Sequence, residues 1–301
     1  MTEPLADLHR HLDGSLRPAT IEALAARAGV TVPEDLAFRA GMGLAEALSK
    51  FAFTLSLLQT PEAVRRVAAE MCEDAAADGV TTLEIRFAPQ LHRGATVEAI
   101  VDAALEGAAG RAGLILCGLY GEPPSVLEEL VRVGATRPGV VGIDLAGGPT
   151  PEHRFGMRDY AGAYRRAAEA GLGRTVHAGE GRPAQEIRDA VELLLAQRIG
   201  HGTTLLSDPA VVELVLERAV TIEACPTSNV HTGVIGSTAE HPLPRWLDAG
   251  VRVCVCTDNT LLSAVVSTEE HRRAGAIPGM TPEKLRQAIA WGHAAAFKRR
   301  A

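Results

Sequence analysis

Two patterns of apolar and polar positions alternate along the chain. Short β-rich runs of five to eight residues, each ending in polar or glycine residues, are separated by Ala/Leu/Glu/Arg-rich stretches with apolar residues at helical spacing. In 61–79, for example, Val64, Val67, Met71 and Ala75 fall on one helical face. Further helices are expected in 125–134, 157–171, 184–196 and 208–219. Strands are expected over 6–12, 81–87, 113–120, 140–146, 174–178, 198–202, 220–225 and 251–257.

This alternation predicts an α/β fold of parallel strands joined by crossover helices. Eight such units in 301 residues favour a (β/α)8 TIM barrel. A doubly wound sheet is the weaker alternative, because no predicted strand runs into a G-x-G-x-x-G turn. Without internal repeats or a low-complexity linker, residues 1–301 are expected to form a single domain. The first two strands are about 70 residues apart, so 15–60 should form extra helices inserted between them, covering one end of the barrel.

Composition narrows the possible partners. The net charge is −7, which argues against binding to a nucleic-acid polymer. There is no run of 18 apolar residues and no signal-peptide pattern, so no membrane span or secretion is expected. Five cysteines are too few and odd in number for a disulfide framework, which favours a reducing, cytoplasmic location. Oligomeric state is left open.

Polar side chains cluster where the predicted strands end. His9 and His11 close the first strand, and His177, His201 and Asp258 close the fifth, sixth and eighth. In a barrel these ends meet on one face, where catalysis takes place. Imidazoles with a carboxylate suit zinc or another divalent transition metal, and a water at an open coordination position would be activated. The hypothesis from the residues alone is metal-assisted hydrolysis.

Each of these residues also has a simpler interpretation. A His-x-His pair near a terminus is more often an ordinary surface pair, and only its phase with His177 and Asp258 favours a metal site. Cys254 and Cys256 are interpreted as small core residues. Nucleophilic serine catalysis is disfavoured because no G-x-S-x-G elbow occurs. The remaining histidines are assigned to surface or packing positions: His92, His153, His231, His241, His271 and His293.

Seven motifs, in order, resemble those of the adenosine deaminase family: "LHRHLDGS", "GIDLAGG", "TVHAGE", "RIGHG", "CPTSN", "HPLPRWLDAG" and "CTDN". The resemblance extends from about residue 6 to 300 and implies a TIM barrel with one catalytic zinc ion. The positions that match the zinc ligands are His9, His11, His177 and Asp258. Glu180 matches the acid that protonates purine N1. It must itself be protonated to do so, and burial would favour its protonated form. His201 matches the histidine that orients the attacking hydroxide, and Asp258 or Glu180 would relay protons to the departing ammonia.

Three further positions carry the expected contacts to substrate. By resemblance, Gly147 offers a backbone donor to purine N3, and Asp13 accepts a hydrogen bond from the ribose 5′-hydroxyl. Asn259 departs from the family pattern, in which many members have a second aspartate. An amide can donate to purine N7 without titrating, so Asn259 should preserve that contact.

The resemblance implies zinc-dependent hydrolytic deamination of the 6-amino group of adenosine or a close adenine nucleoside. The connection at 88–113 is short, so this part of the barrel rim should be open enough for a 5′-modified adenosine such as aminodeoxyfutalosine. Free adenine is a further alternative. A 5′-phosphate is disfavoured because Asp13 would repel it. Two alternatives belong to other functional classes: a metal-dependent ester or amide hydrolase, and a non-catalytic purine-binding relative.

Overall fold

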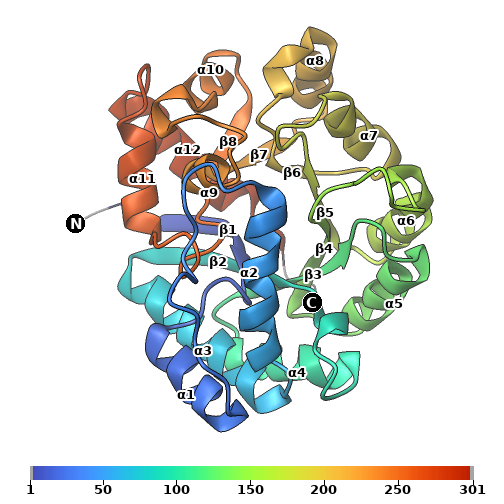
Figure 1. Cartoon of the computed structure of the whole chain (residues 1–301). Helices are drawn as coiled ribbons and strands as arrows, with labels where there is room; N and C mark the ends of the chain where they lie inside the picture. Colours follow the sequence, from blue (N-terminus) through green and yellow to red (C-terminus); the bar gives the residue numbers. More distant parts are fainter. Residues whose placement is uncertain (1–2, 299–301) are drawn as a thin grey trace.

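The computed structural model describes residues 3–298, and eight parallel strands form one sheet in the order of the chain, from β1 to β8. The outer ends of the expected domain, residues 1–2 and 299–301, lie outside the described residues. The strands are β1 (Leu5–His11), β2 (Val80–Phe87), β3 (Gly113–Leu119), β4 (Val140–Ala146), β5 (Gly173–Ala178), β6 (Arg198–His201), β7 (Thr221–Ala224) and β8 (Arg252–Val255). Figure 1 shows the sheet surrounded by helices.

The sheet closes into a barrel at the seam between β1 and the residues that follow β8. The backbone N–H of Asp258 donates to the His9 carbonyl at 2.8 Å, and the N–H of His11 donates to the Asp258 carbonyl at 2.8 Å. The predicted (β/α)8 TIM barrel is therefore confirmed, with all eight strands at the expected places.

Helices alternate with the strands, as the apolar spacing predicts. In α3, the N-cap Thr60 accepts a hydrogen bond from Ala63 N–H, and the predicted face is buried. The expected helix over 157–171 begins as a 3-10 turn, Met157–Tyr160, before α6. The helices are α1 (Pro18–Ala28), α2 (Leu44–Leu57), α3 (Pro61–Ala77), α4 (Val97–Ala108), α5 (Pro124–Ala135), α6 (Ala161–Glu169), α7 (Gln185–Leu193), α8 (Pro209–Glu217), α9 (Pro226–His231), α10 (Leu243–Asp248), α11 (Ser267–Gly275) and α12 (Pro282–Ala295). Within the described chain, no helix is both long and apolar enough to cross a bilayer.

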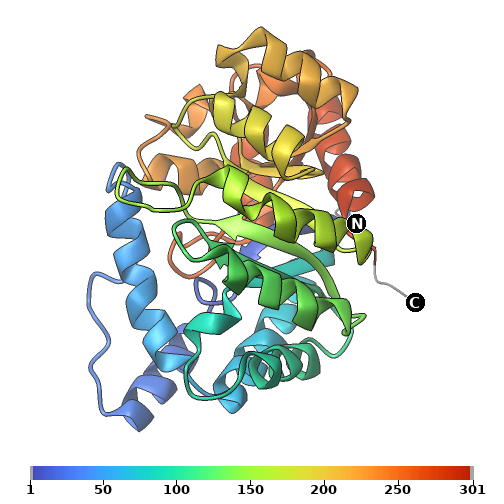
Figure 2. The same cartoon turned by 90° about the vertical axis from the view of Figure 1, so that its right-hand side faces the viewer.

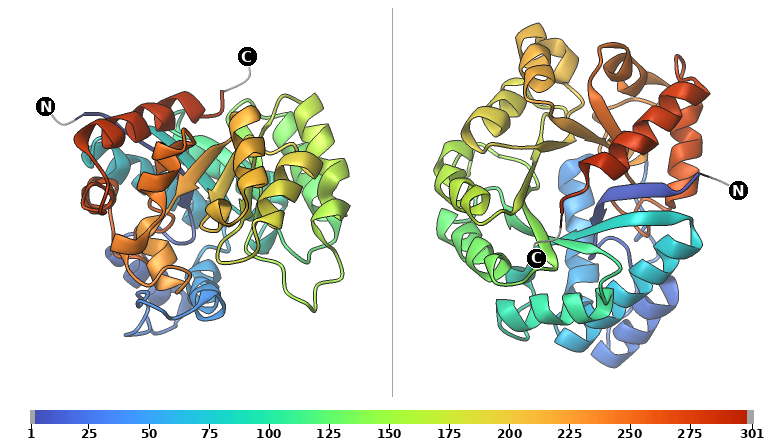
Figure 3. Two further views of the ribbon diagram at one scale, coloured as in Figure 1. Left: turned by 90° about the horizontal axis from the view of Figure 1, so that it is seen from above. Right: turned by 180° about the vertical axis from the view of Figure 1, so that it is seen from behind.

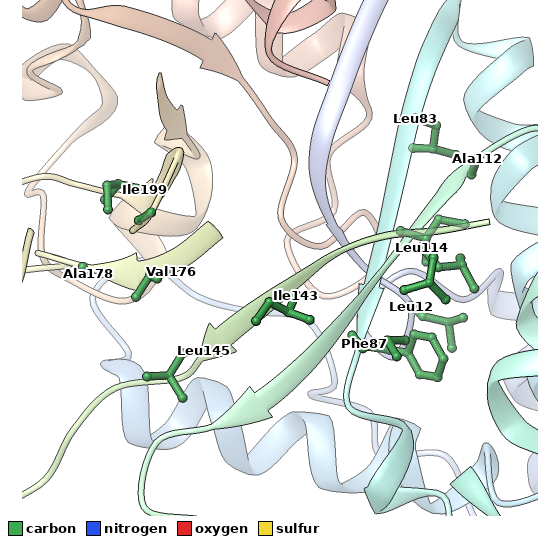
Figure 4. Close-up of a cluster of buried hydrophobic side chains, with 14 of the residues drawn as sticks. Leu12, Leu83, Phe87, Ala112, Leu114, Ile143, Leu145, Val176, Ala178 and Ile199 are labelled. Atoms are coloured by element: carbon green, nitrogen blue, oxygen red, sulfur yellow. The ribbon is translucent and has the colours of Figure 1, made fainter. Parts of the chain in front are cut away.

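Apolar strand residues that face outward fill the layer between the barrel and its helices. Figure 4 shows part of it, with Ile143 and Leu145 of β4 near Val176 of β5. All three side chains are completely buried, which provides much of the hydrophobic stabilisation of the fold.

The two helices inserted between β1 and β2 are present as predicted, and α2 lies across the carboxyl end of the barrel (Figures 1 and 2). The amino-terminal end is covered by α12 and by residues 296–298 (Figure 3). There the Phe297 ring packs so closely on Gly173 that a Cβ at this position would lie 2.1 Å from Cγ of Phe297. Access to the barrel interior is therefore from the α2 side.

Candidate active site

The carboxyl ends of four strands bring the predicted polar residues to one point. The ring centroids of His9 and His177 are 4.6 Å apart, and that of His201 is 5.1 Å from each of them. Nε2 of His9 and Nε2 of His11 lie 3.6 and 3.5 Å from Oδ1 of Asp258. Residues from 9 to 258 thus converge as the barrel topology requires.

His9 and His11 are two residues apart in β1, so both face the barrel interior, and a register shift occurs in the same strand. From Asp7 to Arg10 the strand advances three residues, while the paired residues of β2, Leu83 to Ile85, advance two. Arg10 and Asp7 consequently pair with each other at 2.8 Å in a buried ion pair. The two histidines contact the groups inside the barrel.

The group is chemically suited to a metal ion. Nε2 of His9 is buried without a hydrogen-bond partner, and nitrogen atoms of His9, His177 and His201 lie within 4.8 Å of one another. Burial, followed by nearby positive charge, lowers the pKa of His9 well below its usual value, which keeps the ring neutral with a lone pair to offer. An orphaned imidazole nitrogen facing a carboxylate and further imidazoles fits a divalent transition metal.

Cys225 forms an alternative group with His9 and Asp258, but it is the weaker candidate ligand. Its thiol lies 3.7 Å from the Glu223 carbonyl, and burial raises its pKa well above the usual value, so the neutral thiol is favoured. Cys254 and Cys256 pack with Leu8 in a small buried cluster, as expected of core residues.

Two buried carboxylates in the barrel interior orient His9 and His177. Nδ1 of His9 lies 2.7 Å from Oε2 of Glu223, and Nδ1 of His177 lies 3.0 Å from Oδ2 of Asp144. Burial opposes protonation of His177, but Asp144 outweighs it and raises its pKa. Such contacts place the proton on Nδ1 and turn Nε2 toward a ligand position.

These carboxylates belong to a charged network that fills the barrel interior. Arg86 bridges Asp144 and Glu223, with both contacts at 2.8 Å, and Arg198 bridges Glu223 and Glu84. All five side chains are at most 3% exposed. The network was not predicted from the sequence, although it has a signal there: charged residues at alternate positions of otherwise apolar strands.

Glu180 follows β5 and lies among donors. Its Oε1 accepts hydrogen bonds from Thr232 Oγ1 at 3.1 Å and from Asn229 Nδ2 at 3.4 Å. Within the described part of the chain, Oε2 has no hydrogen-bond partner. Glu180 also lines the main cavity, so one carboxyl oxygen is held by the protein and the other is free to carry a proton.

His201 and Asp258 have positive φ angles of 68° and 62°, which are uncommon for residues with a side chain. Asp258 Oδ2 accepts from Ser228 Oγ at 2.6 Å, and Nδ1 of His201 lies 3.1 Å from Asn229 Nδ2. Ser228 and Asn229 both belong to the short helix α9, so this helix supports two of the predicted site residues.

The start of α9 is held by a buried glutamate on α11. Glu270 accepts hydrogen bonds from the N–H of Thr227 at 2.8 Å and from its hydroxyl. Burial raises the pKa of Glu270 to about 7. Ionisation of Glu270 is therefore unfavourable in the folded protein. The folded state keeps the carboxyl proton at pH values where the unfolded state has lost it.

We expect Glu270→Gln to become relatively more stable than the parent protein as pH rises from 5 to 8. Folding stability falls with pH between the unfolded pKa and the folded value of about 7, and glutamine removes this loss. The expected gain is about 1–3 kcal/mol. Denaturant unfolding at each pH measures it. A difference between the two proteins that does not change with pH would contradict this assignment.

A cavity of about 340 Å³ opens beside the histidines. The face of α2 that covers it is apolar, and Phe51 and Leu55 contribute to it together with Leu91 from the β2–α4 segment. Among the described lining residues the charged ones are acidic: Asp13, Glu180 and Asp258. The cavity therefore suits a flat, neutral, largely apolar ligand with a few polar edges.

The three predicted substrate contacts all lie on this cavity. Oδ1 of Asp13 is buried without a hydrogen-bond partner, and burial raises the pKa of this carboxyl to about 6. Gly147 has φ of +77°, a conformation that favours glycine at the end of β4. Asn259 is buried, and its Oδ1 also has no partner.

All nine predicted site residues thus lie around one cavity or in the histidine cluster beside it. The residues that support them were given no role from the sequence, although three of them lie in the motifs "GIDLAGG" and "CPTSN". They are Asp144, Glu223, Ser228, Asn229 and His241. His241 was assigned to packing or the surface. It is buried, and its Nε2 lies 3.3 Å from Oδ1 of Asn229, which places it in contact with the site.

A TIM barrel with imidazoles and carboxylates gathered at the carboxyl ends of its strands defines a class of metal-dependent enzymes that work by hydrolysis. Comparison with known proteins narrows this class. The family model described as adenosine deaminase matches residues 4–300, and the chain belongs to this family. It is accordingly a hydrolase of the group that acts on carbon–nitrogen bonds in cyclic amidines.

Individual relatives agree with the family match. The chain is 33% identical to an adenosine deaminase of Enterococcus faecalis over 98% of this chain and 92% of that protein. It is also 33% identical to a probable adenosine deaminase of Dictyostelium discoideum, but spans only 40% of that protein's length.

Two solved structures share the fold across the whole chain. An adenine deaminase from Arthrobacter aurescens is 29% identical with a TM-score of 0.89, covering 98% of this chain and 94% of that one. A zinc-bound amidohydrolase from Burkholderia ambifaria is 26% identical with a TM-score of 0.87, covering 98% and 85%.

Proposed function

We propose that residues 1–301 form a single deaminase domain that hydrolyses the 6-amino group of adenosine or a close adenine nucleoside, with one divalent ion, zinc, at the histidine cluster. The observation that carries this proposal is the convergence of four potential ligands beside a buried acid in an apolar cavity. Family membership and the zinc bound in a similar structure support it.

His9, His11, His177 and Asp258 would hold the ion. When bound, it would lower the pKa of a water molecule enough to provide a nucleophile near neutral pH. Adding an oxygen to C6 disrupts the conjugation of the purine ring, and protonation of N1 compensates for that loss. The free Oε2 of Glu180 is the atom suited to deliver this proton, because Oε1 already accepts two hydrogen bonds.

The other residues orient the substrate and stabilise charge. His201 would orient the attacking oxygen and stabilise the charge that arises at the attacked carbon. The Gly147 N–H and the Asn259 amide would donate to N3 and N7. Glu180 or Asp258 would then pass protons to the departing ammonia.

Asp13 favours a nucleoside over the free base. Its Oδ1 is buried without a partner and lines the cavity, so a sugar hydroxyl would satisfy it. The similarity to an adenine deaminase keeps free adenine as the second candidate, and the apolar face of α2 leaves a 5′-modified adenosine such as aminodeoxyfutalosine as a third. A 5′-phosphate would meet acidic side chains and no lysine or arginine among the described cavity residues.

A substrate panel tests the proposal. Zinc-loaded protein is incubated with adenosine, deoxyadenosine, adenine, aminodeoxyfutalosine and adenosine 5′-monophosphate, and the purine absorbance is followed. We expect conversion to be most efficient with a 5′-hydroxyl or 5′-modified nucleoside, and poor with the monophosphate. If no compound in the panel is deaminated, the proposed function is wrong.

For Asp13→Ala, we expect a loss specific to the sugar hydroxyl. Removal of a hydrogen bond to a charged acceptor should lower kcat/KM for adenosine about 10- to 100-fold. With 5′-deoxyadenosine as the matched control substrate, the same variant should lose little. An equal loss with both substrates would show that Asp13 does not recognise this hydroxyl.

The cellular location is proposed on the state of the cysteines. All five are buried free thiols. This supports the reducing, cytoplasmic compartment expected from the sequence.

A further inference from the structure

We infer that His241 is a positioning residue which, through Asn229, holds His201 as a neutral imidazole with its proton on Nε2. The observation is a directional series of hydrogen bonds from a backbone amide to the site. The inference deepens the proposed function and rests on it for its kinetic consequence, whereas the position of the proton can be measured independently.

The series begins at the backbone N–H of Leu243, which can only donate a hydrogen bond. It lies 3.2 Å from Nδ1 of His241, which must therefore accept. His241 is buried, and burial lowers its pKa to about 3, so the ring is neutral. Its single proton is consequently on Nε2.

The Nε2–H donor of His241 fixes the orientation of the Asn229 amide. Nε2 of His241 lies 3.3 Å from Oδ1 of Asn229, so the ring donates and the amide oxygen accepts. The amide NH2 group then points the other way. Its nitrogen lies 3.4 Å from Oε1 of Glu180 and 3.1 Å from Nδ1 of His201, which provides one acceptor for each N–H.

His201 is thereby left with an accepting Nδ1 and a proton on Nε2. The opposite tautomer would have to donate from Nδ1 to Glu180, but those atoms are 3.8 Å apart, too far for a hydrogen bond. The cationic form would place an N–H against the N–H of Asn229.

The consequence for the reaction is a fixed division of tasks. With a proton on Nε2, His201 is a hydrogen-bond donor to the attacking oxygen, and it is not a base for the nucleophile. The same Asn229 amide also fills one acceptor position on Oε1 of Glu180, which leaves Oε2 as the oxygen that carries the proton for N1. His241 therefore influences both groups without touching substrate.

Two substitutions separate this role from simple packing. The His241 ring packs edge-on against Trp246, with centroids 5.2 Å apart. His241→Phe keeps a ring and loses the donor, whereas His241→Gln loses the ring and keeps an N–H donor. We expect kcat to fall about 10- to 100-fold in the phenylalanine variant with KM nearly unchanged, and to be largely retained in the glutamine variant. A packing role predicts the reverse order.

The tautomer is read directly by NMR of the zinc-loaded protein with 15N-labelled histidine, with the His201 signals assigned by comparison with a His201→Asn variant. We expect a protonated Nε2 and bare Nδ1 in the parent and in His241→Gln. Asn229→Asp, which offers only acceptors to His201, should move the proton to Nδ1 and provides a second test if His241→Phe is unstable. His293→Gln, at the opposite end of the barrel, is the control and should change neither kcat nor tautomer.

Three results would overturn the inference. The first is a parent protein in which His201 carries its proton on Nδ1 or on both nitrogens, and the second is a His241→Phe variant with parental kcat and tautomer. The third is a His241→Gln variant that loses more activity than His241→Phe, as a packing role predicts. If the parent protein deaminates nothing in the substrate panel, the proposed function fails instead. The NMR spectrum of the parent then still decides the tautomer.

Discussion

Glu180→Gln should reduce kcat for adenosine by about 10²- to 10⁴-fold while the protein still binds zinc. Glutamine can still accept hydrogen bonds from Asn229 and Thr232 through its carbonyl oxygen, so the local arrangement is preserved. The amide nitrogen in place of Oε2 can donate a hydrogen bond to purine N1 but cannot transfer a proton to it. The loss should therefore be in kcat and only slightly in KM.

The measurement is steady-state deamination together with metal analysis of the purified variant. Glu192→Gln, on α7 away from the cavity, is the matched control and should behave as the parent protein does. A Glu180→Gln variant with more than a tenth of parental kcat would exclude Glu180 as the proton donor. Loss of zinc from the variant would instead point to a structural effect.

Arg86→Met should destabilise the folded protein by about 3–5 kcal/mol. Arg86 is completely buried and bridges Asp144 and Glu223, so methionine leaves two buried carboxylates without their shared cation. Asp144 and Glu223 also orient His177 and His9, and zinc affinity should fall about 10- to 100-fold as a result.

Denaturant unfolding and a zinc competition titration measure these two effects. Arg132→Met is the matched control, because the exposed Arg132 also contacts two carboxylates, Glu98 and Glu129, but in solvent. It should change stability little. If Arg86→Met and Arg132→Met unfold alike, the buried network does not contribute to the stability of the barrel.

The barrel could be predicted because its strands are short apolar runs between helical stretches, and the carboxyl ends of such strands meet by topology alone. The positions of His9, His11, His177 and Asp258 at these ends therefore follow from the sequence pattern. It also anticipated that 15–60 would cover the site, since no crossover connection needs that length.

The supports of the site were harder to predict, for physical reasons. Asp144, Glu223 and Arg86 satisfy one another across the barrel, and pairing between distant strands depends on register that the sequence pattern does not give. His241 lies in the loop before α10, and its contact with Asn229 depends on the conformations of two loops. A single histidine in such a loop has no periodic signal.

The seam of the barrel has a consequence for how the protein is made. His9 and His11 lie in the first strand of the barrel to be synthesised, and Asp258 follows the last one, with mutual backbone hydrogen bonds joining the two segments. The complete set of potential ligands therefore exists only after most of the chain has been synthesised and the ring of strands has closed. An ion bound by the proposed ligands would therefore bind only after this closure, and it would join the first strand of the barrel to the residues that follow the last strand.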